Sequence, residues 1–309
     1  MGNCIEKNTN KDETKNEHNF NTATSKDLTH APLQQRVLDI SENEFESRAV
    51  KPCIDIDKLN LSKHKKIDFE NLPTIGPFKD EEGRIYYGQY KNGKKNGWGK
   101  QISENGSSYE GYWKDNMIQG YGRYIGPNGE IFQGNWFNNK IKGQGVYYHP
   151  DQMQYEGEWK DNKQDGIGIE KWKDELEYEG NFIQGKKHGK GIIKWNSGDK
   201  YEGDFFENEI NGKGTYTWAD NRQFVGEWKN GKMNGKGEFK WPNGNVFKGI
   251  YKEDKKHGKG SFIFNDGRVL KGEWEEGELK DKASLKQSNG KSIKIDRKWK
   301  EIEALSENN

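Results

Sequence analysis

The stretch Tyr109-Glu110-Gly111-Tyr112-Trp113 carries the pattern that decides the fold of this chain. An aromatic residue, a glycine and a second aromatic residue occupy positions 1, 3 and 5 of a 23-residue repeat. The same pattern begins again, always in register, at Tyr86, Phe132, Tyr155, Tyr178, Tyr201, Phe224 and Phe247. A fixed period in the range of about 20–50 residues is typical of repeat arrays, so we expect a solenoid and not a globule.

Each of these eight repeats also has Gly-x-Gly at positions 12 and 14, as at Gly120 and Gly122. Positions 1 to 5 alternate in the way that a β-strand requires, with both aromatic residues and the glycine on one side. Positions 7 and 8 have hairpin-turn chemistry, clearest at Asn92-Gly93 and Asn230-Gly231. A second strand is expected over positions 14 to 18. The sequence therefore predicts two antiparallel strands per repeat.

A single hairpin of this kind is too small to fold alone, because ordering each residue costs about 1–2 kcal/mol. The aromatic rings must therefore pack against neighbouring repeats, and the glycines leave room for them. This predicts an elongated single-layer antiparallel sheet whose two ends need caps. Residues 76–85 fit the second half of a repeat before the first, and a ninth repeat starts at Leu270, Gly272 and Trp274 and then breaks off.

The pattern resembles the MORN (membrane occupation and recognition nexus) repeat over residues 86–269, and over 76–278 with the partial repeats. The resemblance implies an all-β hairpin solenoid and a scaffolding role. Some members tether membranes, such as junctophilins and the repeat region of some plant phosphatidylinositol phosphate kinases. Others organise cytoskeletal or ciliary assemblies, as radial-spoke-head proteins do. In some members a groove along the aromatic face receives a helix of a protein partner.

The sequence departs from this pattern at position 21, where Gln152, Glu175 and Asn221 replace the usual glycine. We expect the three turns between repeats to be looser or differently shaped there. The four tryptophans at position 18 fall in consecutive repeats: Trp172, Trp195, Trp218 and Trp241. They fit either packing within the sheet or a partner-binding face, since tryptophan is a preferred hot-spot residue. The position 5 tryptophans are included in this candidate face: Trp113, Trp136, Trp159 and Trp228.

The chain begins Met-Gly-Asn-Cys, so that removal of Met1 would expose Gly2 for myristoylation beside a palmitoylation candidate, Cys4. Glu6 stands where this signal usually has serine or threonine. A single myristoyl chain binds membranes only marginally, and a second acyl chain makes anchoring stable. Gly2 and Cys4 are therefore the candidate lipidation residues.

Outside the repeats the sequence predicts two further segments. Residues 1–75 form the lipid-anchor signal and a mostly disordered tether, with a weakly amphipathic stretch that includes Leu33, Val37, Leu38 and Phe45. Residues 279–309 form a polar linker and a short C-terminal amphipathic helix, since Ile295, Trp299 and Ile302 have helical spacing over residues 293–305. This helix would cap the last strand or bind a partner.

Composition limits the function. The net charge is +1, without the clustered basic surface that nucleic-acid binding needs. Only 2 cysteines occur, the histidines are scattered, and we expect no metal or other cofactor. Lys186–Gly191 and Lys255–Gly260 lack the strand–loop–helix context of a phosphate loop, although lysines along one edge could contact anionic lipids. We therefore expect a protein that is not an enzyme.

The preferred hypothesis is a membrane-associated scaffold that binds protein partners on the repeat sheet and is held by N-terminal acylation at the cytoplasmic side of the plasma membrane or a cortical membrane. The alternative is a structural component of the cytoskeleton or a cilium. A phosphoinositide-related enzyme accessory is a distant third. Replacement of Gly2 distinguishes the first two, because only the acylated scaffold depends on this residue for its location.

Overall fold

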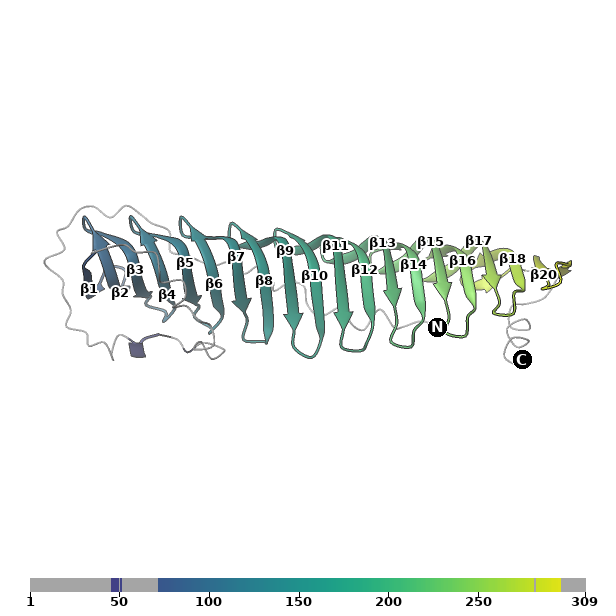
Figure 1. The fold of residues 1–309 in the computed structure, drawn as a ribbon, viewed down its shortest axis with the longest axis horizontal. Coiled ribbons are helices and arrows are strands. Elements are labelled where there is room, and N and C mark those ends of the chain that lie inside the picture. The colour runs from purple at the N-terminus through teal and green to yellow at the C-terminus, as the bar shows by residue number, and fades with distance from the viewer. Residues whose placement is uncertain (1–45, 50, 52–71, 281, 296–309) are drawn as a thin grey trace. The chain divides into compact units, whose positions relative to one another are not determined.

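The structure, a computed structural model, describes residues 46–49, 51, 72–280 and 282–295. These residues form an open, antiparallel sheet of 21 strands, which confirms the all-β, single-layer prediction (Figure 1). The chain divides into an N-terminal unit, residues 14–173 with 182–185, and a C-terminal unit that contains residues 174–181 and 186–309. In the described ranges, no helix has the length and apolar character needed to cross a bilayer.

Strands that follow one another in the chain lie side by side within each unit, in antiparallel pairs (Figure 1). The strands up to the boundary are β1 (Thr74–Lys79), β2 (Ile85–Lys91), β3 (Lys94–Ile102), β4 (Ser108–Lys114), β5 (Met117–Ile125), β6 (Ile131–Phe137), β7 (Lys140–Tyr148), β8 (Met153–Lys160) and β9 (Lys163–Trp172). Those that follow are β10 (Leu176–Ile183), β11 (Lys186–Trp195), β12 (Lys200–Phe206), β13 (Glu209–Thr217), β14 (Gln223–Lys229), β15 (Lys232–Lys240), β16 (Val246–Lys252), β17 (Lys255–Ile263), β18 (Val269–Glu275), β19 (Glu278–Leu279), β20 (Ala283–Lys286) and β21 (Ser292–Ile295).

The hairpin turns at positions 7 and 8 have the predicted geometry. Both residues have positive φ at Asn92-Gly93 (51° and 74°) and at Asn230-Gly231 (50° and 73°), as a type I′ turn requires. The position 8 side chain also links neighbouring repeats, a contact that the sequence pattern did not reveal. Asn208 Oδ1 accepts a hydrogen bond from the backbone N–H of Lys187 in the preceding repeat, at 2.8 Å.

The second strand of each repeat starts earlier than predicted, at position 9 and not at position 14. The first hairpin contains an irregularity: Gly88 and Tyr90 of β2 lie opposite Gly99 and Lys95 of β3, so β3 holds two more residues than β2 between these pairs. Gly97, at position 12, lies in this irregular part and has a φ of +87°. That conformation favours glycine, which explains the first glycine of each Gly-x-Gly.

The three turns without a position 21 glycine behave in two ways. Gln152 and Asn221 adopt a positive φ themselves, 65° and 66°, and keep the turn. Their backbone N–H groups donate to the backbone carbonyls of His149 and Trp218, both at 2.9 Å. Gly106 makes the same bond in an ordinary turn. At Glu175 the positive φ moves to Asp174, with 60°, and the boundary between the two units falls at this turn. The expected change of turn shape therefore holds only at Glu175.

The first and last strands correct the expected ends of the array. Strand β1 pairs with β2 and supplies the predicted half repeat before Tyr86. The ninth repeat does not break off after Gly277, since β19 and β20 both pair with β18. Leu285 lies opposite Leu270, where a ring stands in earlier repeats, and Ala283 replaces the position 14 glycine. The sequence pattern missed this hairpin because Leu270 replaces the position 1 ring and Ala283 replaces the position 14 glycine.

The expected C-terminal helix over residues 293–305 is not shown. Its first three residues belong to strand β21, in which Ile293 pairs with Leu285 of β20. Strand β20 itself occupies part of the expected polar linker. The reason is that the backbone N–H and C=O groups of β18 and β20 need hydrogen-bond partners on a neighbouring strand, and a helix cannot supply them. Trp299 and Ile302 lie outside the described residues.

Candidate partner-binding face

One face of the sheet carries the aromatic side chains, and we call it the ring face. Residues directly opposite one another on neighbouring strands point to the same side of a sheet. Tyr109, at position 1, lies opposite Tyr124, at position 16, and Tyr216 lies opposite Phe224 in the same way. The rings of positions 1, 5, 16 and 18 are therefore on one face.

The rings of positions 1 and 5 form a buried zigzag, the inner row. In the N-terminal unit successive ring centroids are 5.0–5.5 Å apart and the rings are nearly perpendicular, in the order Tyr90, Tyr86, Trp113, Tyr109, Trp136, Phe132, Trp159, Tyr155 and Phe182. In the C-terminal unit the spacing is 4.9–5.6 Å, in the order Tyr178, Phe205, Tyr201, Trp228, Phe224, Tyr251, Phe247 and Trp274. Edge-to-face contacts at this spacing are the preferred aromatic geometry.

Contacts in the inner row join rings of different repeat positions. Each position 1 ring lies between two position 5 rings, one from its own repeat and one from the next. Beneath it lie the glycines of positions 3 and 14. A Cβ atom added at Gly203 or Gly214 would come within 2.5 Å or less of Tyr201. The predicted role of these glycines as space for the ring is confirmed.

The position 5 tryptophans of the candidate face are core residues. Trp113, Trp136, Trp159 and Trp228 are between 2% and 4% exposed. The indole N–H groups of Trp113, Trp159 and Trp228 donate to the position 14 glycine carbonyls of the preceding repeat, at 3.1–3.3 Å. A partner cannot reach these rings without disrupting the sheet, so they do not themselves form a contact surface.

The position 18 tryptophans form a second aromatic row with the position 16 rings, the outer row. In the C-terminal unit it runs through Trp195, Tyr216, Trp218, Phe239, Trp241, Phe262 and Phe264, with centroids 4.5–5.5 Å apart. A position 16 ring separates each of these tryptophans from the next, so they form the row only together with the position 16 rings. Trp218 is buried, whereas Trp195 and Trp241 are partly exposed.

Trp172, the remaining position 18 tryptophan, belongs to the N-terminal unit and is partly exposed. Its indole N–H donates to the carboxylate of Glu170, at 3.1 Å. Glu170 occupies position 16, where Tyr216, Phe239 and Phe262 stand in the C-terminal unit. The N-terminal unit has position 16 rings at Tyr124 and Tyr147, which lie 6.4 Å and 6.2 Å from the inner-row rings of Trp136 and Trp159. The row that alternates position 16 and position 18 rings is the one in the C-terminal unit.

Cationic groups cover several of the outer rings. Lys256 Nζ lies 5.3 Å from the ring centroid of Trp241 and 5.6 Å from that of Phe262. The Arg222 guanidinium lies 5.3 Å from the centroid of Trp218 and also pairs with Asp220 at 2.7 Å. Contacts of this kind stabilise by about 0.5–1 kcal/mol at exposed sites. The ring face thus combines aromatic surface with positive charge.

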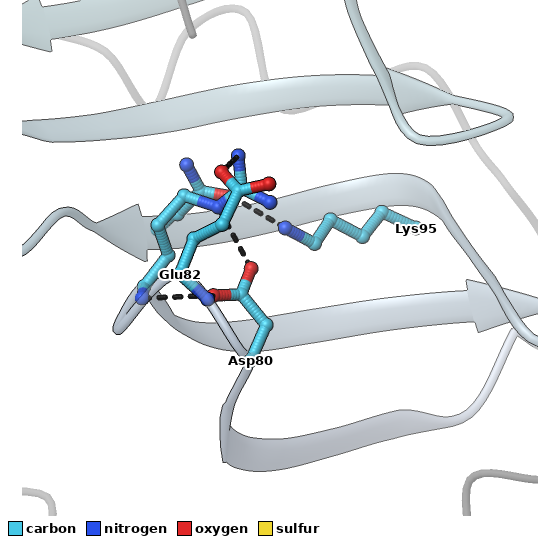
Figure 2. A network of polar contacts seen from close by, with 5 residues as sticks. Asp80, Glu82 and Lys95 are labelled. Carbon is cyan, nitrogen blue, oxygen red and sulfur yellow. Dashed lines mark hydrogen bonds and ion pairs between the residues drawn. The ribbon is translucent and has the colours of Figure 1, made fainter. Parts of the chain in front are cut away.

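A polar cluster occupies the ring face near the start of the array. Figure 2 shows Lys95 at the beginning of β3 beside Asp80 and Glu82, which lie in the β1–β2 turn. Lys95 Nζ also lies 4.9 Å from the ring of Tyr86 and 5.0 Å from that of Trp113. The pKa of Lys95 is lowered to about 8, chiefly by burial and to a smaller extent by the charge of Arg84, while Asp80 and Glu82 act in the opposite direction.

Lysines along the hairpin edge are paired with acids. The position 9 lysine contacts the position 7 acid of the next repeat in four cases: Lys140–Asp161 at 3.0 Å, Lys186–Glu207 at 3.3 Å, Lys232–Glu253 at 3.0 Å and Lys255–Glu276 at 2.7 Å. Each pair is exposed, so each contributes little to stability. Because their charges are balanced, these lysines offer only a weak attraction to anionic lipids.

The lipidation candidates Gly2 and Cys4 lie outside the described residues. No group of three or more histidine, cysteine, aspartate or glutamate side chains with the arrangement of a metal site occurs in the part of the chain that the structure describes. The segments Lys186–Gly191 and Lys255–Gly260 lie in strands β11 and β17, without the helix that a phosphate loop requires.

The repeat sequence matches a known family. The MORN repeat pattern fits eight consecutive segments: residues 86–108, 109–131, 132–154, 155–176, 178–200, 201–221, 224–246 and 247–267. These segments make up more than half of the chain, which therefore belongs to the MORN repeat family. It is a repeat protein of the scaffold type. No curated protein matches its sequence.

Solved structures with a comparable arrangement are distant. The TCP10 domain of Danio rerio CPAP, in complex with a peptide of Danio rerio STIL, is 15% identical, with a TM-score of 0.36 over 68% of this chain and 97% of that chain. The SAS-4 (dCPAP) TCP domain of Drosophila melanogaster, in complex with a proline-rich motif of Ana2, is 14% identical, with a TM-score of 0.17 over 73% and 90%. Neither similarity is close enough to carry an argument about function.

Proposed function

We propose that this chain is a non-enzymatic scaffold that binds a protein partner on the ring face of its C-terminal unit and is held at a membrane by N-terminal acylation. The observation that carries the docking role is the outer row, in which Trp195 and Trp241 remain partly exposed while their neighbours are buried. Contacts with Tyr216, Phe239 and Phe262 hold these two indoles in place. A partner therefore meets rigid aromatic anchors, which lose little side-chain entropy on binding.

The chemistry of the face favours a particular kind of partner. Aromatic surface with Lys256 above it suits an apolar-faced helix that also carries acidic side chains. The helix would place apolar residues against Trp195 and Trp241 and carboxylates near the ammonium group. Tryptophan hot spots commonly contribute about 2 kcal/mol or more, which corresponds to a factor of about 30 in Kd.

Site-specific photocrosslinking in cells tests the docking role. A benzoylphenylalanine residue at position 241 should give a discrete crosslinked product, which acidic competitor peptides with an apolar face reduce. In the matched control, benzoylphenylalanine replaces Val246, which lies on the opposite face of the sheet. Equal products from both positions, or none from position 241 in a chain with native circular dichroism, would contradict docking on the ring face.

The membrane part of the proposal rests on Gly2 and Cys4. Acylation of both would supply the two lipid signals that stable anchoring requires, at the cytoplasmic side of the plasma membrane or a cortical membrane. Metabolic labelling with an alkyne myristate should mark the wild type and not the Gly2→Ala variant. A palmitate label sensitive to hydroxylamine should disappear in Cys4→Ala. Lack of myristate label in the wild type would remove the anchor from the proposal.

A further inference from the structure

One line of residues on the face opposite the ring face, which we call the second face, is mainly apolar and buried in the first repeats. Residues at positions 17 and 23 lie opposite one another on neighbouring strands, and so they form one continuous line across this face. From β2 to β6 the line consists of Ile85, Ile102, Ser108, Ile125 and Ile131. Ile85 is 2% exposed, Ile102 is 1% exposed and Ile131 is 0% exposed.

The same line is polar and accessible in the C-terminal unit. From β11 to β16 it consists of Lys194, Lys200, Thr217, Gln223, Lys240 and Val246. All six are partly or fully exposed. The strand register is the same in both units, so burial on this face depends on the side chains present and on what covers them. A side chain on the outer side of a single sheet becomes fully buried only under another layer.

Residues 46–49 of this chain begin that covering layer. Ala49 packs against Ile85 and Ile102. The carboxylate of Glu46 forms an ion pair with Nζ of Lys100, which lies on the same face of β3, two residues before Ile102. This contact reaches only the first repeat, whereas the buried line extends to Ile131 on β6.

We propose that residues 33–45, which directly precede this contact, dock on the second face of strands β2 to β6 as an amphipathic helix. Leu33, Val37, Leu38 and Phe45 have the helical spacing that gives such a helix one apolar side. Three strand intervals separate Ile102 on β3 from Ile131 on β6, about 14 Å. A helix of 13 residues is about 20 Å long, so the segment can cover this distance.

This packing would divide the array between two tasks. The N-terminal unit would bind the chain's own segment on its second face, while the C-terminal unit would keep its ring face for a partner. The helix would also fix where the N-terminal anchor segment leaves the array. The docking of residues 33–45 does not depend on acylation or on partner binding, so it can be tested separately.

Thiol labelling of the full chain tests the proposal. In a Cys4→Ser/Cys53→Ser background, Ser108→Cys places a nearly isosteric probe on the buried line. Val246→Cys places the matched probe at the same repeat position in the C-terminal unit. We expect maleimide to label the Ser108→Cys probe about tenfold or more slowly, because labelling there requires local opening. Adding Val37→Asp and Leu38→Asp should remove this difference while the β-sheet signal in circular dichroism is retained.

Two results would overturn the proposal. The first is equal labelling of the two probes in the background with the native segment, which would mean that the face is open. The second is slow labelling at Ser108→Cys that persists after Val37→Asp and Leu38→Asp, which would mean that something else covers it. Measurement over a range of protein concentrations identifies a second copy of the chain as that cover, since its protection falls on dilution.

Discussion

Substitution of a position 14 glycine tests the packing of rings on glycines most sharply. A Cβ atom at Gly214 would lie 2.3 Å from Tyr201 Oη and 2.4 Å from its Cζ. Carbon atoms pack at about 3.5–4.0 Å, so the ring would have to move by roughly 1 Å. It has little room to do so, because Tyr201 is fully buried between Phe205 and Trp228, whose centroids lie 5.3 Å and 5.6 Å away.

Gly214→Ala should therefore lower the free energy of unfolding by about 2–4 kcal/mol. Overpacking of a well-packed core typically costs about 1–3 kcal/mol. The Tyr201 hydroxyl also donates to the Asp204 carbonyl, at 3.1 Å, and loss of this bond adds about 1 kcal/mol. Guanidinium chloride titration followed by tryptophan fluorescence measures the change. The control Gly231→Asn should cost less than about 1 kcal/mol, because no atom lies near that Cβ and asparagine adopts the same turn position at Asn208.

A second substitution decides whether the ring is the cause. The ninth repeat has Leu270 in place of the ring and Ala283 in place of the glycine. Tyr201→Leu with Gly214→Ala copies this arrangement, so the double variant should be more stable than the sum of the two single costs implies, by about 1 kcal/mol or more. Strict additivity, or a cost of Gly214→Ala no larger than that of Gly231→Asn, would refute the reasoning.

Three further predictions concern other parts of the sheet. Trp228→Ala should lower the free energy of unfolding by about 3–5 kcal/mol and Trp241→Ala by clearly less in the same titration, because only Trp228 belongs to the buried inner row. Asn208→Gly keeps the turn but removes the hydrogen bond from Lys187, and calorimetry should show a loss of about 1 kcal/mol. The free energy of unfolding should rise from about pH 8 to about pH 10, because the folded pKa of Lys95, about 8, lies below its value in the unfolded chain, so the folded state loses this proton first. Lys95→Met should remove this rise. Above about pH 10 the raised pKa of buried tyrosines such as Tyr86 lowers the free energy of unfolding instead.

Much of the fold could be predicted from the sequence because its determinants are local. The positive φ of Asn92 and Gly93 and the fit of the Tyr201 ring over Gly214 both depend on residue types at fixed spacing. The zigzag between positions 1 and 5 of neighbouring repeats could not be predicted, because periodicity shows which residues share a face but not which rings meet. For the same reason the sequence did not distinguish buried Trp228 from partly exposed Trp241.

The ends of the array were harder to predict, since end repeats differ from internal ones. The ninth hairpin carries Leu270 and Ala283 in place of ring and glycine, so its residues no longer match the repeat. The spacing of Ile295 with later residues resembles a helix, yet Ile295 ends strand β21. Here pairing with the sheet edge outweighs local preference. The buried second face was also missed, because an isolated repeat does not show what covers it.

The central claim is that the array binds partners while the N-terminus sets the location of the protein. The most direct test measures the membrane-bound fraction of the full-length protein beside that of the Gly2→Ala variant. We predict that the wild type sediments with membranes and is released by nonionic detergent, and that Gly2→Ala moves to the soluble fraction. Identical fractionation of the two proteins would contradict the account. Retention of both in a detergent-insoluble pellet would instead support a cytoskeletal or ciliary component.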